Sequence, residues 1–90
     1  MEKVAFTVID PVGLHARPAT ILVNVAVNYK SEIRLNALKK TIDFKSIMGV
    51  MSLGIYSGTV IEIKCEGEDE NEALESISKQ ISALQLGREI

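Results

Sequence analysis

Apolar and polar residues alternate along four short segments of the chain, which is the pattern of strands with one buried face. These segments are residues 4–8, 33–35, 42–44 and 59–65. Ala37-Leu38-Lys39-Lys40 separates the second strand from the third and predicts a hairpin, although its turn contains no glycine. Asp10-Pro11-Val12-Gly13 follows the first strand and contains the proline and glycine typical of a loop.

Three further segments have apolar residues three or four positions apart, as on one face of a helix. They cover residues 18–30, 46–54 and 69–84. We expect Ser46 to cap the second helix and Gly54 to end it. At the third helix, Asp69 and Glu72 have the spacing of a capping box, and Gly87 is expected to stop the helix.

The order strand, helix, strand, strand, helix, strand, helix predicts a single α+β domain over residues 1–90. In this fold class one antiparallel sheet is covered on one face by helices. The first helical segment also contains Val23, Val25 and Val27, whose alternation would suit a strand. Pro18 favours a helix, because proline fits a first helical turn and does not fit a central strand.

Composition and charge exclude several classes of protein. Lys and Arg number 10 against 12 Asp and Glu, for a net charge of -2, so the chain lacks the basic excess of proteins that bind nucleic acids directly. Any anion must then be bound locally. One cysteine and one histidine provide neither an internal disulfide nor a structural zinc site, so we expect a buried Cys65, no metal and no other cofactor. No apolar run reaches the ~20 residues of a membrane span, and we expect a cytoplasmic protein without membrane insertion.

The candidate chemistry lies in Gly13-Leu14-His15-Ala16-Arg17-Pro18, where a loop leads into the first helix. A helix start has unpaired backbone N–H groups and partial positive charge, so it binds anions without a large basic patch. Arg17 adds a guanidinium that can pair with two phosphate oxygens. On these residues alone His15 could equally be a helix cap, since nucleophilic catalysis also needs an orienting group that the sequence does not identify.

Two motifs at a fixed separation point to one family. Leu14-His15-Ala16-Arg17-Pro18-Ala19-Thr20 and Lys45-Ser46-Ile47-Met48-Gly49-Val50-Met51-Ser52-Leu53-Gly54 closely resemble HPr, the histidine-containing phosphocarrier of the bacterial phosphoenolpyruvate:sugar phosphotransferase system. The resemblance covers essentially the whole chain. It implies an open-faced sandwich, in which a four-stranded antiparallel sheet of order 1-4-2-3 lies under three helices.

The resemblance implies that His15 is a phosphoryl carrier rather than the centre of an independent enzyme. His15 would accept the group from enzyme I on its Nδ1 atom and pass it to the IIA unit of a sugar permease, with Arg17 stabilising the phosphate. A carrier must not bind the group too tightly, which favours a half-exposed site. Val12 departs from the family, where a Ser or Thr commonly precedes the glycine, so we assign it no binding role.

Ser46 has two interpretations. From its position it is an N-cap worth about 1 kcal/mol. The resemblance to Gram-positive members implies instead that HPr kinase/phosphorylase phosphorylates it, as a regulatory mark that slows phosphorylation of His15 and could be recognised by a catabolite-control regulator.

The short helix around residue 50 carries more apolar residues than one face can bury. Since Val50 and Leu53 are needed for the core, the resemblance implies that Ile47, Met48 and Met51 form a docking patch near His15, where flexible Met suits several partners. The expected rim residues are Ala16, Thr20, Ser52 and Tyr56.

Two alternatives to the sugar-transport carrier remain open. The first is a regulatory protein of the same fold that signals through phospho-Ser46 to a transcriptional regulator; the presence of His15 favours the carrier. The second is a small ferredoxin-like metal-binding domain, which would need paired cysteines or clustered histidines that the sequence lacks. A carrier that presents one face to successive partners is most simply a monomer.

Overall fold

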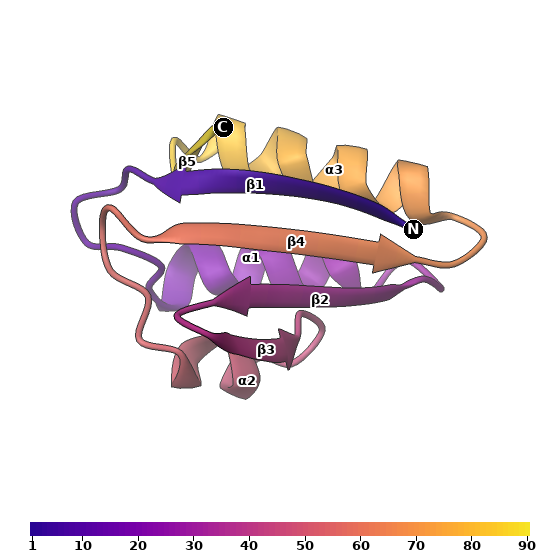
Figure 1. Cartoon of the computed structure of the whole chain (residues 1–90), viewed down its shortest axis with the longest axis horizontal. Helices are drawn as coiled ribbons and strands as arrows, with labels where there is room; N and C mark the ends of the chain where they lie inside the picture. Colours follow the sequence, from indigo (N-terminus) through magenta and orange to yellow (C-terminus); the bar gives the residue numbers. More distant parts are fainter.

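The computed structural model describes all residues from 1 to 90, in eight elements of secondary structure (Figure 1). They are β1 (Glu2–Val8), α1 (Ala16–Ala26), β2 (Glu32–Ala37), β3 (Lys40–Asp43), α2 (Ile47–Ser52), β4 (Val60–Glu66), α3 (Glu70–Ala83) and β5 (Gly87–Glu89). The helices lie on one face of the sheet and leave its other face open (Figure 1). The predicted α+β open-faced sandwich is therefore confirmed.

The sheet has the strand order β3-β2-β4-β1-β5, and all neighbours are antiparallel. The first four strands have the predicted order 1-4-2-3. The predicted strand number is wrong, because β5 adds a fifth strand beside β1. Gly87 begins this strand, and a Cβ at Gly87 would lie 3.2 Å from the Cβ of Phe6 and 3.1 Å from Ile81. Glycine thus allows the end of the chain to pack closely against β1 and α3.

The predicted hairpin joins β2 to β3. Ala37 pairs with Lys40, so the turn consists of Leu38 and Lys39. Both residues have positive φ angles, 52° and 66°, which is the conformation of a type I′ turn. The turn therefore forms without the glycine or asparagine that usually marks it.

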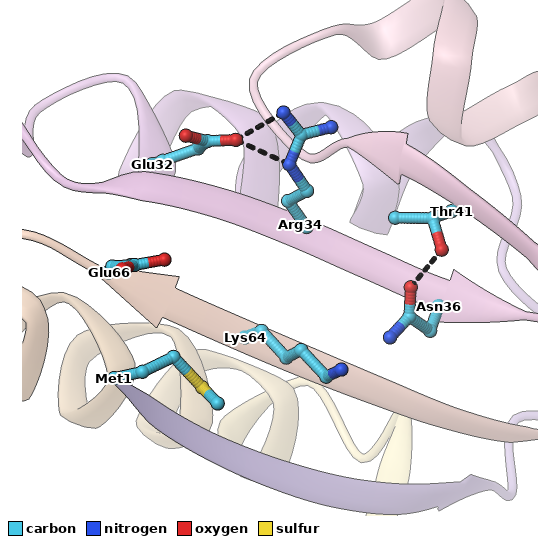
Figure 2. Close-up of a pocket in the computed structure, with 7 residues that line it drawn as sticks. All are labelled: Met1, Glu32, Arg34, Asn36, Thr41, Lys64 and Glu66. Carbon is cyan, nitrogen blue, oxygen red and sulfur yellow. Dashed lines mark hydrogen bonds and ion pairs between the residues drawn. The ribbon is translucent and has the colours of Figure 1, made fainter.

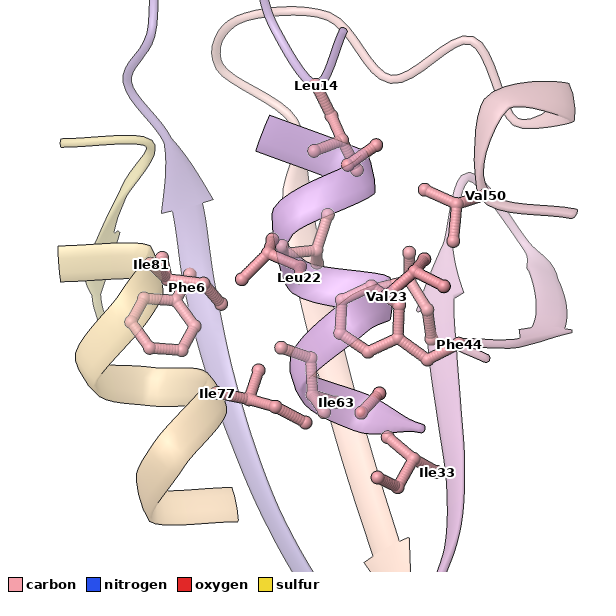
Figure 3. Packing of buried hydrophobic residues seen from close by; sticks show 14 of the residues in the cluster. Phe6, Leu14, Leu22, Val23, Ile33, Phe44, Val50, Ile63, Ile77 and Ile81 are labelled. Atoms are coloured by element: carbon pink, nitrogen blue, oxygen red, sulfur yellow. The ribbon is translucent and has the colours of Figure 1, made fainter. Parts of the chain in front are cut away.

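The core lies between the sheet and the helices, and every second residue of the strands points into it (Figure 3). In β4, for example, Ile61, Ile63 and Cys65 are buried while the residues between them face the open side. Cys65 is in the core as expected, and burial raises the pKa of its thiol to about 11. The thiol is therefore protonated at neutral pH and contributes as a small apolar side chain.

The predicted first helix is too long at its end and the predicted capping box is wrong. Helix α1 ends at Ala26 rather than near Lys30. Asp69 precedes α3, yet its carboxylate makes no bond to that helix. It accepts instead from the backbone amides of Lys30 (2.8 Å) and Ser31 (2.9 Å) and from the Ser31 hydroxyl. The hydrogen bonds from Ser31 and from the Lys30 amide hold the pKa of Asp69 below its usual range.

No helix in the structure has the length and apolar character needed to cross a membrane.

Candidate functional site

The loop between β1 and α1 is fixed against the segment that follows α2. Gly13 has a φ of +81°, and a Cβ there would lie 2.5 Å from the backbone oxygen of Ile55 and 2.8 Å from the Cα of Tyr56. The next amide, that of Leu14, donates to the same Ile55 oxygen at 3.0 Å. Only glycine fits this approach, which determines where the following residue, His15, enters the helix.

His15 is the N-cap residue of α1, but only through its backbone. Its backbone is extended (φ -103°, ψ -179°), and its carbonyl accepts from the Ala19 amide at 3.0 Å. The imidazole makes no capping hydrogen bond, so the interpretation of His15 as a side-chain cap is wrong. The ring is 38% exposed, which leaves it accessible to a second protein.

Asp10 lies beside the imidazole, and the sequence pattern did not identify it as a site residue. Its Oδ2 atom is 3.5 Å from Nε2 of His15, a distance of charge contact rather than of a short hydrogen bond. Its Oδ1 atom accepts from the Val12 amide at 2.9 Å, and its carbonyl accepts from the Gly13 amide at 2.8 Å. Because Nε2 faces Asp10, Nδ1 is the ring nitrogen without a neighbouring carboxylate.

The start of α1 has the unsatisfied donors that an anion needs. The amides of Ala16 and Arg17 make no hydrogen bond within the protein, and Pro18 has no amide hydrogen. The Arg17 side chain is exposed and takes part in none of the ion pairs of the chain. Two backbone donors and one guanidinium are thus free next to His15, in a protein with no basic excess.

Ser46 is the N-cap of α2, as the sequence predicts. Its hydroxyl oxygen accepts from the Gly49 amide at 3.0 Å, and its carbonyl accepts from the Val50 amide at 3.0 Å. The side chain is half-buried. Its hydroxyl therefore already has a structural role in the unmodified protein.

The apolar residues of α2 divide as the pattern predicts. Val50 and Leu53 are buried, whereas Ile47, Met48 and Met51 are 37%, 81% and 39% exposed. The residues expected at the rim, Ala16, Thr20, Ser52 and Tyr56, are also exposed. Helices α1 and α2 pack together, so these side chains and the start of α1 belong to one region of the surface.

Figure 3 shows how the core supports this region. Leu14, at the start of α1, and Val50, from α2, are labelled at the same end of the core, with Phe44 and Val23 below them. Both Leu14 and Val50 are buried. Leu14, which precedes His15, and Val50, one turn after Ser46, thus anchor α1 and α2 in a single apolar cluster.

A shallow depression lies elsewhere, on the open face of the sheet (Figure 2). It is lined by Met1, Glu32, Arg34, Asn36, Thr41, Lys64 and Glu66. Arg34 pairs with Glu32, and Lys64 lies 3.6 Å from Glu62, so the positive charges there are already matched. This depression contains none of the predicted site residues, and we assign it no part in the chemistry. No three His, Cys, Asp or Glu side chains gather as a metal-binding cluster would require.

The fold and the site define a small α+β open-faced sandwich that presents its single histidine at a helix start. The chain matches the family model described as the PTS HPr component phosphorylation site over residues 3–83. Its structure is similar to the histidine-containing phosphocarrier protein of Mycoplasma, with a TM-score of 0.95 and 37% identity over 97% of this chain and 99% of that one. The chain therefore belongs to the HPr family, the phosphocarriers of the phosphotransferase system.

Two other solved structures extend this comparison. The phosphocarrier protein HPr of Bacillus anthracis is 39% identical over 88% of this chain and 94% of its own, with a TM-score of 0.80. The Bacillus subtilis catabolite repression protein Crh is 39% identical over 82% of this chain and 85% of its own, with a TM-score of 0.71. The resemblance inferred from the two motifs is confirmed, and the family implies a carrier rather than an independent catalyst.

Proposed function

We propose that this chain carries phosphoryl groups on Nδ1 of His15, accepting them from enzyme I and passing them to the IIA unit of sugar permeases. The observation that carries the proposal is the state of the His15 side chain. It lies at a helix start, makes no capping bond, and is 38% exposed beside the free amides of Ala16 and Arg17. A histidine that only stabilised the helix would use its side chain there.

The transfer itself needs few groups. The lone pair of Nδ1 attacks the phosphorus atom of phosphorylated enzyme I, the bond from phosphorus to the donor atom breaks with its electron pair going to that atom, and the Nδ1–P bond forms. In the next step His15 is the donor: an acceptor atom of the IIA unit attacks the phosphorus, and the Nδ1–P bond breaks. In this proposal the free amides at the start of α1 and the Arg17 guanidinium stabilise the phosphoryl oxygens. Because the site is open, the phosphoryl group is not enclosed and can be passed on.

The proposed docking patch consists of Ile47, Met48 and Met51, with Ala16, Thr20, Ser52 and Tyr56 at its rim. Its support is the exposure of three large apolar side chains on one six-residue helix. Exposed Met side chains adapt to differently shaped partners, as a carrier with several partners requires. We infer that the carrier acts as a monomer, because each partner would need the same patch. A dimer of HPr from Thermoanaerobacter tengcongensis is among the similar structures, so sedimentation of this chain tests that point.

Ser46 is proposed as the regulatory site, modified by HPr kinase/phosphorylase. A phosphate on Ser46 would add about two negative charges at the start of α2, where the helix dipole tolerates them. The same charges would lie at the edge of the docking patch and oppose an acidic partner surface. The expected consequence is slower phosphorylation of His15 with little change in fold.

A regulatory role is the second candidate function. Its support is the similarity to Crh, which is described as a catabolite repression protein. In that role phospho-Ser46 would be recognised by a catabolite-control regulator. The two roles are compatible in one protein, since they use different residues.

Labelling by enzyme I and phosphoenolpyruvate tests the carrier function. We expect one acid-labile phosphoryl group, which is lost in His15→Ala and retained in Ser46→Ala. Acid-stable label, or label that persists in His15→Ala, would contradict the proposal. The matched experiment with ATP and HPr kinase/phosphorylase should give acid-stable label that is lost in Ser46→Ala and retained in His15→Ala. Equal acid-stable labelling of Ser46→Ala and His15→Ala would mean that the kinase modifies a residue other than Ser46.

A further inference from the structure

The contact between Asp10 and His15 suggests a role that the two family motifs do not include. We propose that Asp10 is a positioning residue for phosphoryl transfer: its carboxylate holds the proton of the neutral imidazole on Nε2 and so leaves the lone pair of Nδ1 free. This inference rests on the proposed function of His15. It adds the orienting group that nucleophilic catalysis requires.

The backbone fixes Asp10 from both sides. The carbonyl of Leu86, just before β5, accepts from the amide of Ile9 at 2.8 Å and from the amide of Asp10 at 3.2 Å. The Asp10 carbonyl in turn accepts from Gly13, and its Oδ1 accepts from Val12. With Oδ1 held in this turn, Oδ2 is the oxygen directed at His15. Little additional ordering is needed to place the carboxylate.

The chemistry of the two groups determines the proton position. A neutral imidazole has one N–H donor and one acceptor nitrogen, whereas an ionised carboxylate only accepts. The nitrogen that faces Asp10 is therefore the donor, and this nitrogen is Nε2. The present distance of 3.5 Å is longer than a good hydrogen bond, and such contacts tighten when a partner covers the site.

This arrangement also balances the transfer step. When Nδ1 forms its bond to phosphorus, the ring keeps the proton on Nε2 and becomes cationic. The Asp10 carboxylate offsets that positive charge, so no separate base has to remove a proton. When the phosphoryl group leaves for the next acceptor, the Nδ1–P electron pair returns to the ring and restores the neutral Nε2–H form.

The simpler role of Asp10 is to stabilise the turn through Val12, and two substitutions separate the roles. Asp10→Asn keeps an oxygen for the Val12 amide but directs an NH2 group at Nε2. Since NH2 donates, the ring proton should move to Nδ1, which blocks the nucleophile. Asp10→Ala loses the turn bond but leaves the ring free to adopt either form. If Asp10 positions the ring proton, Asp10→Asn should slow phosphorylation of His15 more than Asp10→Ala does. If Asp10 only stabilises the turn, Asp10→Ala should have the larger effect.

The test uses the full chain with 15N-labelled histidine, without enzyme I, in alkaline solution where imidazole is neutral. In the unsubstituted protein the two ring nitrogens should show the Nε2–H pattern. In Asp10→Asn the pattern should reverse, and in Asp10→Ala it should be mixed. Single-turnover labelling by phosphorylated enzyme I should then fall about tenfold in Asp10→Asn and about threefold in Asp10→Ala, less than in a fully buried carboxylate–histidine pair.

Asp43 provides a matched control. Its Oδ1 accepts from the amide two residues on, that of Lys45, at 3.0 Å, in the same way as Asp10 with Val12. It forms no ion pair with His15. Asp43→Asn and Asp43→Ala should leave the ring spectrum unchanged.

Two results would overturn the role of Asp10. The first is an unchanged ring spectrum in Asp10→Asn, and the second is a reversed spectrum with an unchanged rate. If enzyme I labels none of the proteins, including the unsubstituted one, the proposed function of His15 fails. The ring spectrum, which needs no phosphorylation, still decides separately whether Asp10 sets the proton position.

Discussion

The starts of α1 and α2 both have an N-cap residue in extended conformation, but the two side chains behave differently. His15 and Ser46 are both N-cap residues in extended conformation, with φ angles of -103° and -108°. Each carbonyl accepts from the amide four residues on, at 3.0 Å in both cases. The Ser46 hydroxyl, however, bonds to the Gly49 amide, whereas the His15 imidazole bonds to no amide and faces Asp10.

This difference separates a side chain used for folding from one available for chemistry. At α2 the serine completes the helix, so any modification must begin from a side chain that already has a partner. At α1 the backbone alone begins the helix, and the histidine is free to react. Of the two helix starts, only the first has a side chain without a capping bond, and that side chain lies beside a carboxylate.

Two glycines of positive φ, Gly13 before the start of α1 and Gly54 after the end of α2, should give the largest contrast. Gly13→Ala should lower the free energy of unfolding by about 3 kcal/mol, because the new Cβ would meet backbone atoms of Ile55 and Tyr56 at 2.5 and 2.8 Å. Gly54→Ala should cost only about 1 kcal/mol, since its φ is also positive but no atom lies within 4 Å. Urea unfolding measures both, and equal losses would contradict the tight fit of the His15 loop.

A negative charge at the start of α2 should slow the reaction of His15, at the start of α1, by weakening the docking of enzyme I. Ser46→Asp should lower the rate of His15 labelling by enzyme I about tenfold at low salt, because the added charge opposes docking, and the effect should shrink as salt rises. Aspartate is itself a good N-cap, so the fold should be retained. Asn71→Asp, at an exposed position in the first turn of α3, adds the same charge to another helix start and should leave the rate unchanged. An unaffected rate in Ser46→Asp would contradict the regulatory mechanism.

Removing each N-cap side chain should distinguish the two helix starts in stability. Ser46→Ala should cost about 1 kcal/mol of unfolding free energy through loss of the bond to Gly49. His15→Ala should cost less than about 0.5 kcal/mol, because the imidazole makes no capping bond. Thermal unfolding of the two variants checks this order. A larger loss for His15→Ala would mean that the histidine does stabilise the helix.

The smallest expected effect is the pH-dependent contribution of Asp69, the N-cap residue of α3, to stability. Hydrogen bonds lower the folded-state pKa of Asp69 below its unfolded value of about 3.9. The resulting stabilisation is complete at neutral pH and is lost as the pH falls from about 4 through the lower folded pKa. Asp69→Asn should therefore flatten the acid limb of the stability curve, whereas the exposed Glu72→Gln should not. Parallel acid limbs for the Asp69 variant and the unsubstituted protein would contradict this interpretation.

The sequence predicted the parts of the fold that depend on local periodicity. The alternation of Ile61, Ile63 and Cys65 identified a buried face, and the excess of apolar residues around Val50 separated core positions from exposed ones. The two motifs then identified the family. These predictions succeeded because burial on one face repeats at the period of the element that carries it.

The features that the sequence did not predict depend on contacts between distant segments. Strand β5 has three residues, too few to show alternation, and forms because β1 offers a free edge. Asp69 has the spacing of a capping box, but its carboxylate accepts instead from the amides of Lys30 and Ser31, which lie 39 and 38 positions away. Asp10 lies five residues before His15, and only the turn through Val12 and Gly13 brings the two side chains together.

The identity of the phosphorylated atom is the most direct test of the carrier function. The protein, labelled with 15N in histidine and phosphorylated by enzyme I and phosphoenolpyruvate, can be followed by 31P–15N correlation spectroscopy. We predict that phosphorus is bonded to Nδ1 of His15, with the proton on Nε2 beside Asp10. Phosphorus bonded to Nε2 would contradict the assigned atom, and phosphorus bonded to no nitrogen of His15 would contradict the carrier function itself.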